Sequence, residues 1–146
     1  MKAVAVKKTK SVEFFWRIHP FLFKITGGRF VSSFGGVPIC MLTTTGRKSG
    51  EKRTKALLCI AHGDDYIVIA SYAGEPRHPA WYFNLKANPK AQIQIRSSVI
   101  DVVAREAEGE ERETLWNLAV SAYGGFTEYK ERTDRKIPVM LLERVR

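Results

Sequence analysis

Residues 39–61 of the 146-residue chain read ICMLTTTGRKSGEKRTKALLCIA. The apolar runs at 39–42 and 56–60 are typical of two strands, and the polar stretch between them has a glycine at each end of its tip. Because Gly46 and Gly50 can adopt positive φ without steric cost, this stretch is predicted to turn tightly. The segment is therefore expected to form a hairpin, which begins a sheet of antiparallel strands.

The tip of this hairpin concentrates positive charge. Five cations face one acid, Glu51, and hydroxyl groups lie between them; the cations are Arg47, Lys48, Lys52, Arg53 and Lys55, and the hydroxyls belong to Ser49 and Thr54. Like charges at this density repel one another unless an anion or water screens them. Two interpretations follow, a solvated turn, which charge runs commonly are, or a site for an anionic ligand. The spacing of the glycines excludes a P-loop.

Outside the hairpin, hydrophobic patterns predict an α+β chain. Six strands are expected, at residues 39–45, 52–61, 66–71, 91–96, 99–107 and 137–145, and helices are expected at 80–87, 110–123 and, for a short segment, 126–132. In the second helix Leu115, Leu118, Ala119 and Ala122 are predicted to form the buried face. Since short turns join most of the strands, we expect one antiparallel sheet curled into a barrel with flanking helices.

The chain is predicted to be a single domain with a distinct beginning. Residues 1–28 form a basic segment that becomes an amphipathic helix, and residues 29–146 form the barrel domain. The lysines and aromatic residues of the helix leave three alternatives open. The helix packs on the protein body, lies on an anionic membrane surface through residues 11–26, or covers a ligand cleft.

Composition narrows the range of partners and compartments. The net charge is +9 and the pI is near 9.8, which favours an acidic partner such as a nucleic acid, an anionic lipid, or a phosphorylated or polycarboxylate ligand. Cys40 and Cys59 lie in apolar runs without metal-ligand spacing, so we expect reduced core thiols and no metal site. No run approaches the ~18–20 apolar residues of a membrane-spanning helix, and no signal-peptide cleavage site follows the first lysines. A cytoplasmic protein is expected, with peripheral attachment to the inner face of the membrane as an alternative.

A second cluster follows the third predicted strand. Ser71 ends that strand, a glycine loop comes next, and Trp81 and Phe83 lie in the helix that follows. This order predicts a flat slot with polar edges, suited to a planar ring, although core packing of the aromatic residues is the alternative. The sequence shows no Ser-His-Asp order, no paired catalytic carboxylates and no metal-ligand cluster. If the chain is an enzyme, a bound cofactor is expected to carry the chemistry.

Six short blocks occur in an order that is specific to one family. They are TTTGRKSG at 43–50, RT at 53–54, GD at 63–64, AS at 70–71, PAWY at 79–82 and NLKANP at 84–89. With these blocks the chain resembles the deazaflavin-dependent nitroreductase family of actinobacteria, from about residue 14 to the C-terminus. The resemblance implies a six-stranded split β-barrel, of the kind that binds FMN, and it implies binding of coenzyme F420. This coenzyme is a 5-deazaflavin with a phosphate and a polyglutamate tail, so it is planar at one end and polyanionic at the other.

The resemblance also implies roles for single residues. Toward the cofactor they are Arg47, Lys48, Ser49, Arg53 and Thr54 at the phosphate and tail; Ala56, Leu57 and Leu58 beside the ring; Ala70, Ser71 and Tyr72 near its reactive part; and Ala80, Trp81 and Asn84 at the helix start that closes the slot. Tyr123, Phe126 and Tyr129 line the substrate side. Ser71 and Tyr123 are the implied catalytic residues: Ser71 hydrogen-bonds near the ring, and Tyr123 orients the acceptor or donates a proton.

The chain departs from the family pattern at four positions. Lys52 and Ala56 stand where prolines are common, which predicts a less rigid loop. Tyr72 replaces a lysine that some members have, which removes one phosphate contact. Phe126 lacks the hydroxyl of the usual tyrosine, which predicts a changed range of acceptors.

The function implied is an F420H2-dependent oxidoreductase. It transfers hydride from the reduced deazaflavin to an electron-poor acceptor such as a quinone, an unsaturated carbonyl, or a nitroaromatic or nitroimidazole compound. One alternative is an FMN-dependent oxidoreductase on the same barrel. A non-enzymatic module that binds nucleic acid or a membrane surface is another, but nucleic acid is not expected, because the cations form a knot at one turn rather than a stripe. The sequence leaves the oligomeric state open.

Overall fold

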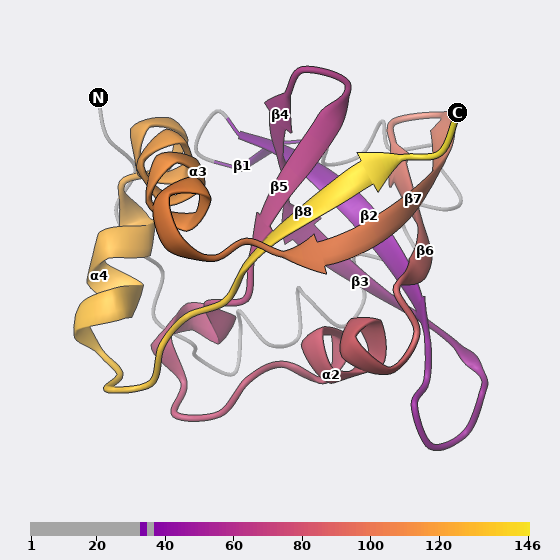
Figure 1. The fold of residues 1–146 in the computed structure, drawn as a ribbon, viewed down its shortest axis with the longest axis horizontal. Coiled ribbons are helices and arrows are strands. Elements are labelled where there is room, and N and C mark those ends of the chain that lie inside the picture. Colours follow the sequence, from indigo (N-terminus) through magenta and orange to yellow (C-terminus); the bar gives the residue numbers. More distant parts are fainter. Residues whose placement is uncertain (1–32, 35–36) are drawn as a thin grey trace.

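The computed structural model describes residues 33–34 and 37–146 (Figure 1). Within these residues the strands are β1 Ser33–Phe34, β2 Val37–Thr45, β3 Lys52–Leu58, β4 Ile60–His62, β5 Asp65–Ile69, β6 Lys90–Ile95, β7 Ser98–Glu106 and β8 Val139–Arg144. The helices are α2 Ala80–Ala87, α3 Gly109–Ala122 and α4 Gly125–Glu131, and a 3-10 turn, η1, spans Tyr72–Gly74. The three predicted helices are confirmed, each to within two residues at its ends.

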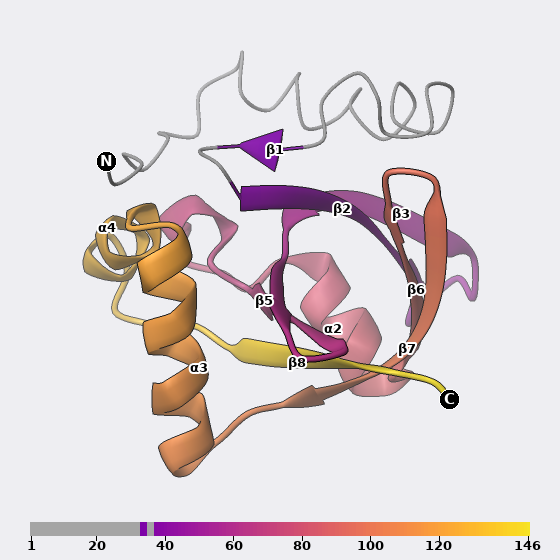
Figure 2. The ribbon, with the colours of Figure 1, turned by 90° about the horizontal axis from the view of Figure 1, so that it is seen from above.

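The strands form one antiparallel sheet that curls on itself. Its order is β1-β2-β6-β7-β8-β5-β4, and β3 pairs with β2 beside this path. Because β3 runs on into β4, and β4 pairs with β5 at the far end of the path, the two ends of the sheet are brought together (Figure 2). The predicted curled antiparallel sheet is confirmed.

The predicted count of six strands was too low for the described residues, where the sheet has eight. The strand expected at 52–61 divides at Cys59, whose N–H still donates to the Pro38 carbonyl of β2 at 3.0 Å. The next residue, Ile60, already pairs with Ile67 of β5. Cys59 is thus the corner at which the chain changes partners, and the apolar run at residues 56–61 continues through it. The other extra strand, β1, has two residues, too few for a pattern to predict.

One core fills the barrel and is closed at one end by α2. Trp81 and Leu85 of this helix pack with Leu42, Ile93 and Leu142 from the strands, and all five are buried. Figure 1 shows α2 below the curled strands, with the β2–β3 tip projecting beyond it. Burial of large apolar side chains in this way is the main stabilising contribution to the fold.

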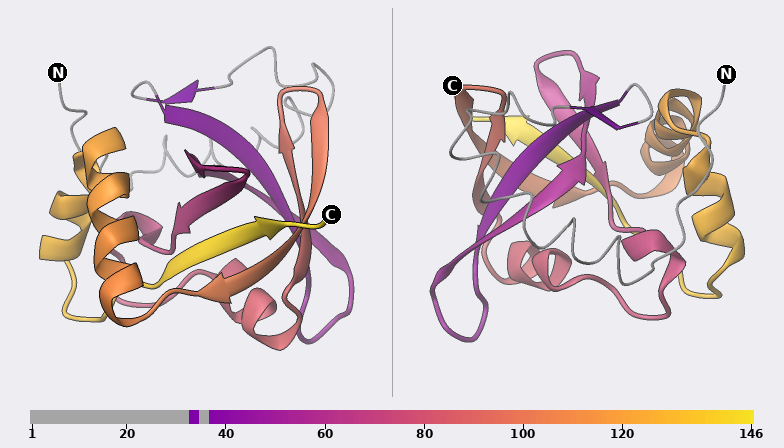
Figure 3. Two further views of the ribbon diagram at one scale, coloured as in Figure 1. Left: turned by 45° about the horizontal axis from the view of Figure 1, so that its top comes forward. Right: turned by 180° about the vertical axis from the view of Figure 1, so that it is seen from behind.

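A second core lies outside the barrel, under α3 and α4. Ile67 and Ile69 of β5 and Leu141 of β8 belong to it, whereas their neighbours Val68 and Met140 belong to the barrel core. Both faces of β5 are therefore buried, which explains its continuous apolar run. Figure 3 shows α3 and α4 together at the end of the molecule opposite the β2–β3 tip.

The buried face predicted for α3 was partly wrong, because the observed face is rotated about the helix axis by part of a turn. Leu115 and Ala119 are buried as expected, but Leu118 is 41% exposed and Ala122 is exposed. Trp116 occupies the core instead, in line with Tyr123 at the end of the helix. The two stripes have the same spacing, and the larger aromatic side chains are the ones buried because they remove more apolar surface from water.

Cys40 and Cys59 are buried free thiols, which confirms their prediction as core residues. A hydrogen bond with Cys59, together with burial, raises the pKa of the Cys40 thiol well above its ordinary value. The predicted segment 1–28, including the helix at 11–26, lies outside the described residues. Among the residues that are described, no helix has the length and apolarity needed to span a bilayer.

Candidate active site

The tip between β2 and β3 is closed by its own backbone. Gly46 donates to the Glu51 carbonyl at 2.7 Å, and Gly50 donates to the Gly46 carbonyl at 2.8 Å. Only one of the two glycines needs positive φ, since Gly50 has φ +71° and Gly46 does not have positive φ. Gly46 instead leaves room inside the turn, since a Cβ there would lie 2.6 Å from the Ser49 hydroxyl and 3.2 Å from the Glu51 carbonyl oxygen. The expectation of a tight turn is confirmed, but the role predicted for Gly46 was wrong.

The cations of the tip are exposed and weakly paired. Arg53 contacts Glu51 at 3.2 Å, with side chains 59% and 70% exposed, and Lys52 donates to the Thr45 hydroxyl at 3.1 Å. A surface ion pair of this kind contributes only about 0–1 kcal/mol. Arg47 and Lys48 have no acidic partner among the described residues. These cations are available to an anion from solution.

The predicted cofactor residues of β3 are divided between two faces of the ribbon. Thr54 hydrogen-bonds Thr43 at 2.8 Å, and Ala56, on the same face, packs with Ile39 and Met41. Leu57 lies on the opposite face, toward the barrel core. Arg53 shares the face of Leu57 because side chains alternate along the strand. The ring-wall residues Ala56, Leu57 and Leu58 therefore do not form one surface.

Asn84 ties the basic tip to α2. This side chain is 5% exposed; its amide donates to the Thr44 hydroxyl at 3.1 Å, and its carbonyl accepts the N–H of Arg47 at 3.1 Å. The guanidinium of Arg47 lies over the ring of Phe83, 4.7 Å from its centre. The sequence predicted Asn84 at the site, but it did not identify Thr44 as its partner or Phe83 as the platform for Arg47.

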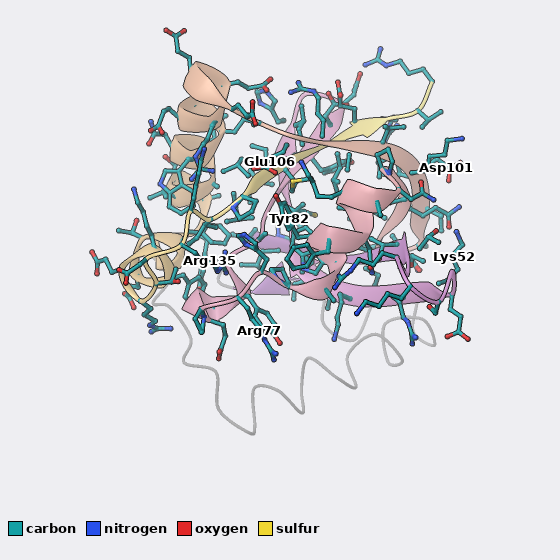
Figure 4. The ribbon with its side chains drawn as sticks, turned by 60° about the horizontal axis from the view of Figure 1, so that its bottom comes forward. Lys52, Arg77, Tyr82, Asp101, Glu106 and Arg135 are labelled. Atoms are coloured by element: carbon teal, nitrogen blue, oxygen red, sulfur yellow. The ribbon has the colours of Figure 1, made fainter. Side chains whose placement is uncertain are left out.

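Around Phe83, α2 and the preceding loop hold a cluster of rings. His78, Tyr82 and Phe83 lie with ring centres 4.8–5.7 Å apart. The Tyr82 hydroxyl donates to Glu106 of β7 at 2.7 Å, and burial, together with this bond, raises the pKa of Tyr82 to about 12. In Figure 4 Tyr82 lies between Arg135 on one side and Lys52 on the other, and Glu106 is next to it. Trp81, by contrast, is 6% exposed in the barrel core, and Ala80 is exposed.

Ser71 follows β5 and is held in place by its neighbours. Ala70 still donates to the Pro138 carbonyl at 3.0 Å, as if the strand continued. The residue Ser71 is 7% exposed, and its hydroxyl has no hydrogen-bond partner within 33–34 and 37–146. A buried polar group without a partner is costly, so this hydroxyl is a candidate contact for a ligand.

The segment after Ser71 is strained. Tyr72, Ala73 and Gly74 have φ of +47°, +53° and +78°, so three consecutive residues lie in the left-handed region. For residues with a side chain this conformation costs about 1–3 kcal/mol each. Glycine is required at the third position, where a Cβ would lie 2.7 Å from the Cβ of Arg132 and 2.9 Å from the Tyr129 carbonyl. Such strain is typical of functional segments.

Arg135 is a residue that sequence reasoning missed. Its guanidinium donates to the Ser71 carbonyl at 2.8 Å and to the Glu75 carbonyl at 3.0 Å, and it lies 3.0 Å from Nδ1 of His78. Because arginine only donates, Nδ1 of His78 accepts this bond and the ring proton lies on Nε2. Burial and the Arg135 charge lower the pKa of His78, and Glu106 partly offsets them.

The three aromatic residues predicted on the substrate side are brought together. The hydroxyls of Tyr123 and Tyr129 are 2.9 Å apart, and the ring of Phe126 meets that of Tyr123 edge-on at 5.0 Å. All three are buried, Tyr123 completely. Gly125 allows this arrangement, since a Cβ there would lie within 2.6 Å of two ring atoms and the hydroxyl oxygen of Tyr123.

These donors fit a ligand that is polyanionic at one end and planar at the other. Arg47, Lys48 and Arg53 offer exposed cations at the tip, and Ser71, which follows β5, offers a hydroxyl without a hydrogen-bond partner in the described part of the chain. No group of His, Cys, Asp or Glu in the described part of the chain could hold a metal ion. Coenzyme F420 has the two ends that this donor set requires.

Comparisons with known proteins agree with this chemistry. The family model of F420H(2)-dependent quinone reductase matches residues 15–144. An F420H(2)-dependent quinone reductase of Mycobacterium tuberculosis is 36% identical over 132 residues, which cover 88% of this chain and 89% of the relative. The solved structure of an F420-H2 dependent reductase (FDR-A) is 50% identical, with a TM-score of 0.68, and covers 73% of this chain and 94% of its own.

Other solved structures confirm the fold. One described as a domain-swapped dimer is 42% identical, with a TM-score of 0.70, and covers 90% of this chain and 99% of its own. A heme binding protein from Mycobacterium smegmatis, 18% identical with a TM-score of 0.59 over 73% of this chain and 46% of its own, shares the fold alone. The predicted split barrel is thereby confirmed. The chain belongs to the F420H(2)-dependent quinone reductase family, a family of oxidoreductases whose cofactor is coenzyme F420.

Proposed function

We propose that this enzyme reduces a quinone, holding F420H2 by its anionic end at the β2–β3 tip and by its ring beside Ser71. The observation that carries the proposal is the buried Ser71 hydroxyl without a partner in the described part of the chain, next to the strained segment that ends at Gly74. When bound, F420H2 supplies the hydride. The protein supplies position, electrostatics and protons.

The tip binds and orients the cofactor. Arg47, Lys48 and Arg53 contact the phosphate and tail, and Ser49 and Thr54 add neutral donors. Each well-formed charge-assisted contact contributes roughly 1.5–3 kcal/mol net. Asn84 fixes the position of Arg47 through the backbone, and Phe83 fixes its guanidinium. The remaining predicted residues, Ala56, Leu57, Leu58, Ala70, Tyr72, Ala80 and Trp81, contact or support the ring.

The acceptor binds beside Tyr123, Phe126 and Tyr129. Reduction of a quinone needs a proton as well as a hydride, and the Tyr123 hydroxyl holds one next to that of Tyr129. Tyr123 donates to the acceptor oxygen and Tyr129 orients Tyr123, which requires that acceptor binding uncover the Tyr123 hydroxyl, since Tyr123 is completely buried in this structure. We expect Tyr123→Phe to lower kcat about 10²-fold. The control Tyr66→Phe, in the barrel strand β5, leaves kcat unchanged.

One experiment tests cofactor and acceptor together. Quenching of tryptophan fluorescence is compared for F420, FMN and NADPH, and oxidation of F420H2 is then followed with a menaquinone analogue, an unsaturated carbonyl and a nitroimidazole. We expect binding of F420 and fastest turnover with the quinone. Binding of FMN without F420 would favour the flavin-dependent alternative, and binding of F420 without quinone turnover would transfer the assignment to another acceptor.

The location of the enzyme in the cell is a finer part of the same proposal. We infer a cytoplasmic enzyme that attaches to the inner face of the membrane through residues 11–26, since this segment is rich in Phe and Trp, contains Arg17 and Lys24 and follows four lysines, and a lipid-soluble acceptor lies in the bilayer. Deletion of residues 1–28 should abolish partition onto anionic liposomes. Unchanged partition would refute the attachment.

A further inference from the structure

The left-handed segment Tyr72–Gly74 has two carbonyl groups at its boundaries, Ser71 before it and Glu75 after it. Both carbonyls accept hydrogen bonds from the single guanidinium of Arg135, at 2.8 and 3.0 Å. The Ser71 carbonyl also accepts the N–H of Gly74 at 2.9 Å, which closes the turn. The strained conformation is therefore held from both ends by one side chain.

The third contact of Arg135 extends this clamp to α2. His78 accepts from the guanidinium through Nδ1, and its ring packs against Tyr82 and Phe83. Phe83 is the ring under Arg47 of the basic tip. Arg135 thus connects the Ser71 segment to the surface on which the anionic end of the cofactor is proposed to bind. Figure 4 shows Arg135 on the same side of the molecule as Tyr82.

Arg135 lies in the connection between α4 and β8. It is 64 residues from Ser71 in the sequence. Its position depends on the fold around it: Arg112 of α3 donates to the Ile137 carbonyl at 2.6 Å, two residues further along the same connection. The connection is therefore anchored to the helical side of the molecule, while Arg135 reaches across to the cofactor side.

We propose that Arg135 is a positioning residue for cofactor binding, which sets the place of Ser71 by clamping Ser71, Glu75 and His78. The inference rests on the proposed function, since it assumes that Ser71 contacts the deazaflavin. Without the clamp the left-handed turn relaxes to an unstrained conformation, and the Ser71 hydroxyl leaves its place. A displacement of this kind weakens binding of a rigid ring.

Two substitutions and one matched control test the proposal. Arg135→Met removes all three donations at nearly constant length, and Arg135→Lys keeps the charge but cannot span three acceptors with one ammonium group. Arg105→Met is the control, because Arg105 also makes three side-chain hydrogen bonds, to Glu111 and Glu143 on the outside of the barrel. Unfolding midpoints of all variants are measured first; if Arg135→Met does not fold, Arg135→Lys decides the outcome.

The first readout is the Kd for F420, from tryptophan fluorescence quenching. We expect Kd to rise about tenfold in both Arg135 variants and to stay unchanged in Arg105→Met. Millimolar guanidinium should restore binding to a smaller variant, Arg135→Ala, because it replaces the missing group. Restoration distinguishes positioning from a general loss of stability.

The second readout is the pKa of His78 by NMR titration, which does not depend on the cofactor. The groups facing His78 are Arg135, Tyr82 and, through its charge, Glu106. Because Arg135 and burial lower this pKa in the native protein and Glu106 raises it, Arg135→Met should raise it. A merely structural contribution elsewhere would leave it unchanged.

The outcomes separate the two proposals. Failure of the wild-type chain to bind F420 overturns the proposed function and, with it, the role of Arg135 in cofactor binding. Wild-type binding with an unchanged Kd in the Arg135 variants overturns the positioning role alone. An unchanged pKa of His78 in Arg135→Met overturns the clamp itself.

Discussion

Replacement of Asn84 by alanine tests how the basic tip is attached to the barrel. The Asn84 side chain makes two hydrogen bonds, one to the Thr44 hydroxyl and one from the Arg47 N–H, both 3.1 Å long. Thr44 is 1% exposed, so water cannot replace the lost donor, whereas Arg47 is exposed and can be rehydrated. The main cost therefore falls on Thr44 and on the small cavity that is left.

The expected magnitude follows from these two parts. An unsatisfied buried hydroxyl costs about 1–3 kcal/mol, and the lost packing of a short polar side chain adds roughly 1 kcal/mol. We expect Asn84→Ala to lower the free energy of unfolding by about 3 kcal/mol in urea titrations. Thr44→Val in the same background removes the orphaned hydroxyl, so the double variant should regain about 1 kcal/mol relative to Asn84→Ala.

The same substitution should affect ligand binding. With the Arg47 N–H released, the tip loses its hydrogen bond to α2 and keeps only the stacking of Arg47 on Phe83, so Kd for F420 should rise by about tenfold. Asn88→Ala is a suitable control, because Asn88 directly follows the last residue of α2, and its side chain only accepts a local hydrogen bond from the backbone N–H of Lys90. Two results would refute this account of the site. One is that the changes in unfolding free energy of Asn84→Ala and Thr44→Val simply add in the double variant; the other is that Asn84→Ala loses no more stability than Asn88→Ala.

Three further predictions concern other contacts. Arg53→Gln should raise Kd for F420 about tenfold while kcat changes little, because Arg53 is proposed to hold the anionic end and not the reacting atoms; equal losses in both would contradict this. Gly125→Ala should lower the free energy of unfolding by about 2–3 kcal/mol, since the new Cβ overlaps the Tyr123 ring, and an unchanged urea midpoint would show that the ring can move. Tyr82 has a folded pKa of about 12, above its ordinary value of 10.0, so its contribution to stability is present below pH 10 and is lost as the pH rises toward 12. Alkaline unfolding of Tyr82→Phe, compared with wild type, should lack this loss.

The parts of the fold that could be predicted are those set by local pattern. The β2–β3 hairpin follows from two apolar runs on either side of a glycine turn, and in the structure its register pairs Ile39 with Leu58 and Thr45 with Lys52. The corner at Cys59 could not be found in this way, because the apolar run continues while the partner strand changes. On α3, spacing alone did not distinguish two adjacent stripes, and the size of Trp116 decided which one is buried.

The candidate site likewise has a local part that could be predicted from the sequence and a long-range part that could not. Charge and hydroxyl groups at the tip are a local property, so Arg47, Lys48 and Arg53 could be chosen from the sequence. The contacts that position them join residues far apart: 40 residues separate Asn84 from Thr44, and 57 separate Arg135 from His78. Rules based on residue spacing cannot predict contacts between residues so far apart in the sequence. The strained backbone at Tyr72 and Ala73 was equally hidden, because both residues ordinarily avoid positive φ.

The structure also bears on the proposed acceptor side, where the family resemblance implies a tyrosine at the position of Phe126. The Phe126 ring is 3% exposed and packs edge-on against both Tyr123 and Tyr129. A hydroxyl here would have to find a partner in this apolar setting or incur the cost of burial without one. The polar character of the trio is therefore concentrated in the hydroxyl pair of Tyr123 and Tyr129. Gly74, at which a Cβ would lie 2.9 Å from the Tyr129 carbonyl, places the end of the Ser71 segment against the backbone of Tyr129, so that the proposed cofactor and acceptor sites share one boundary.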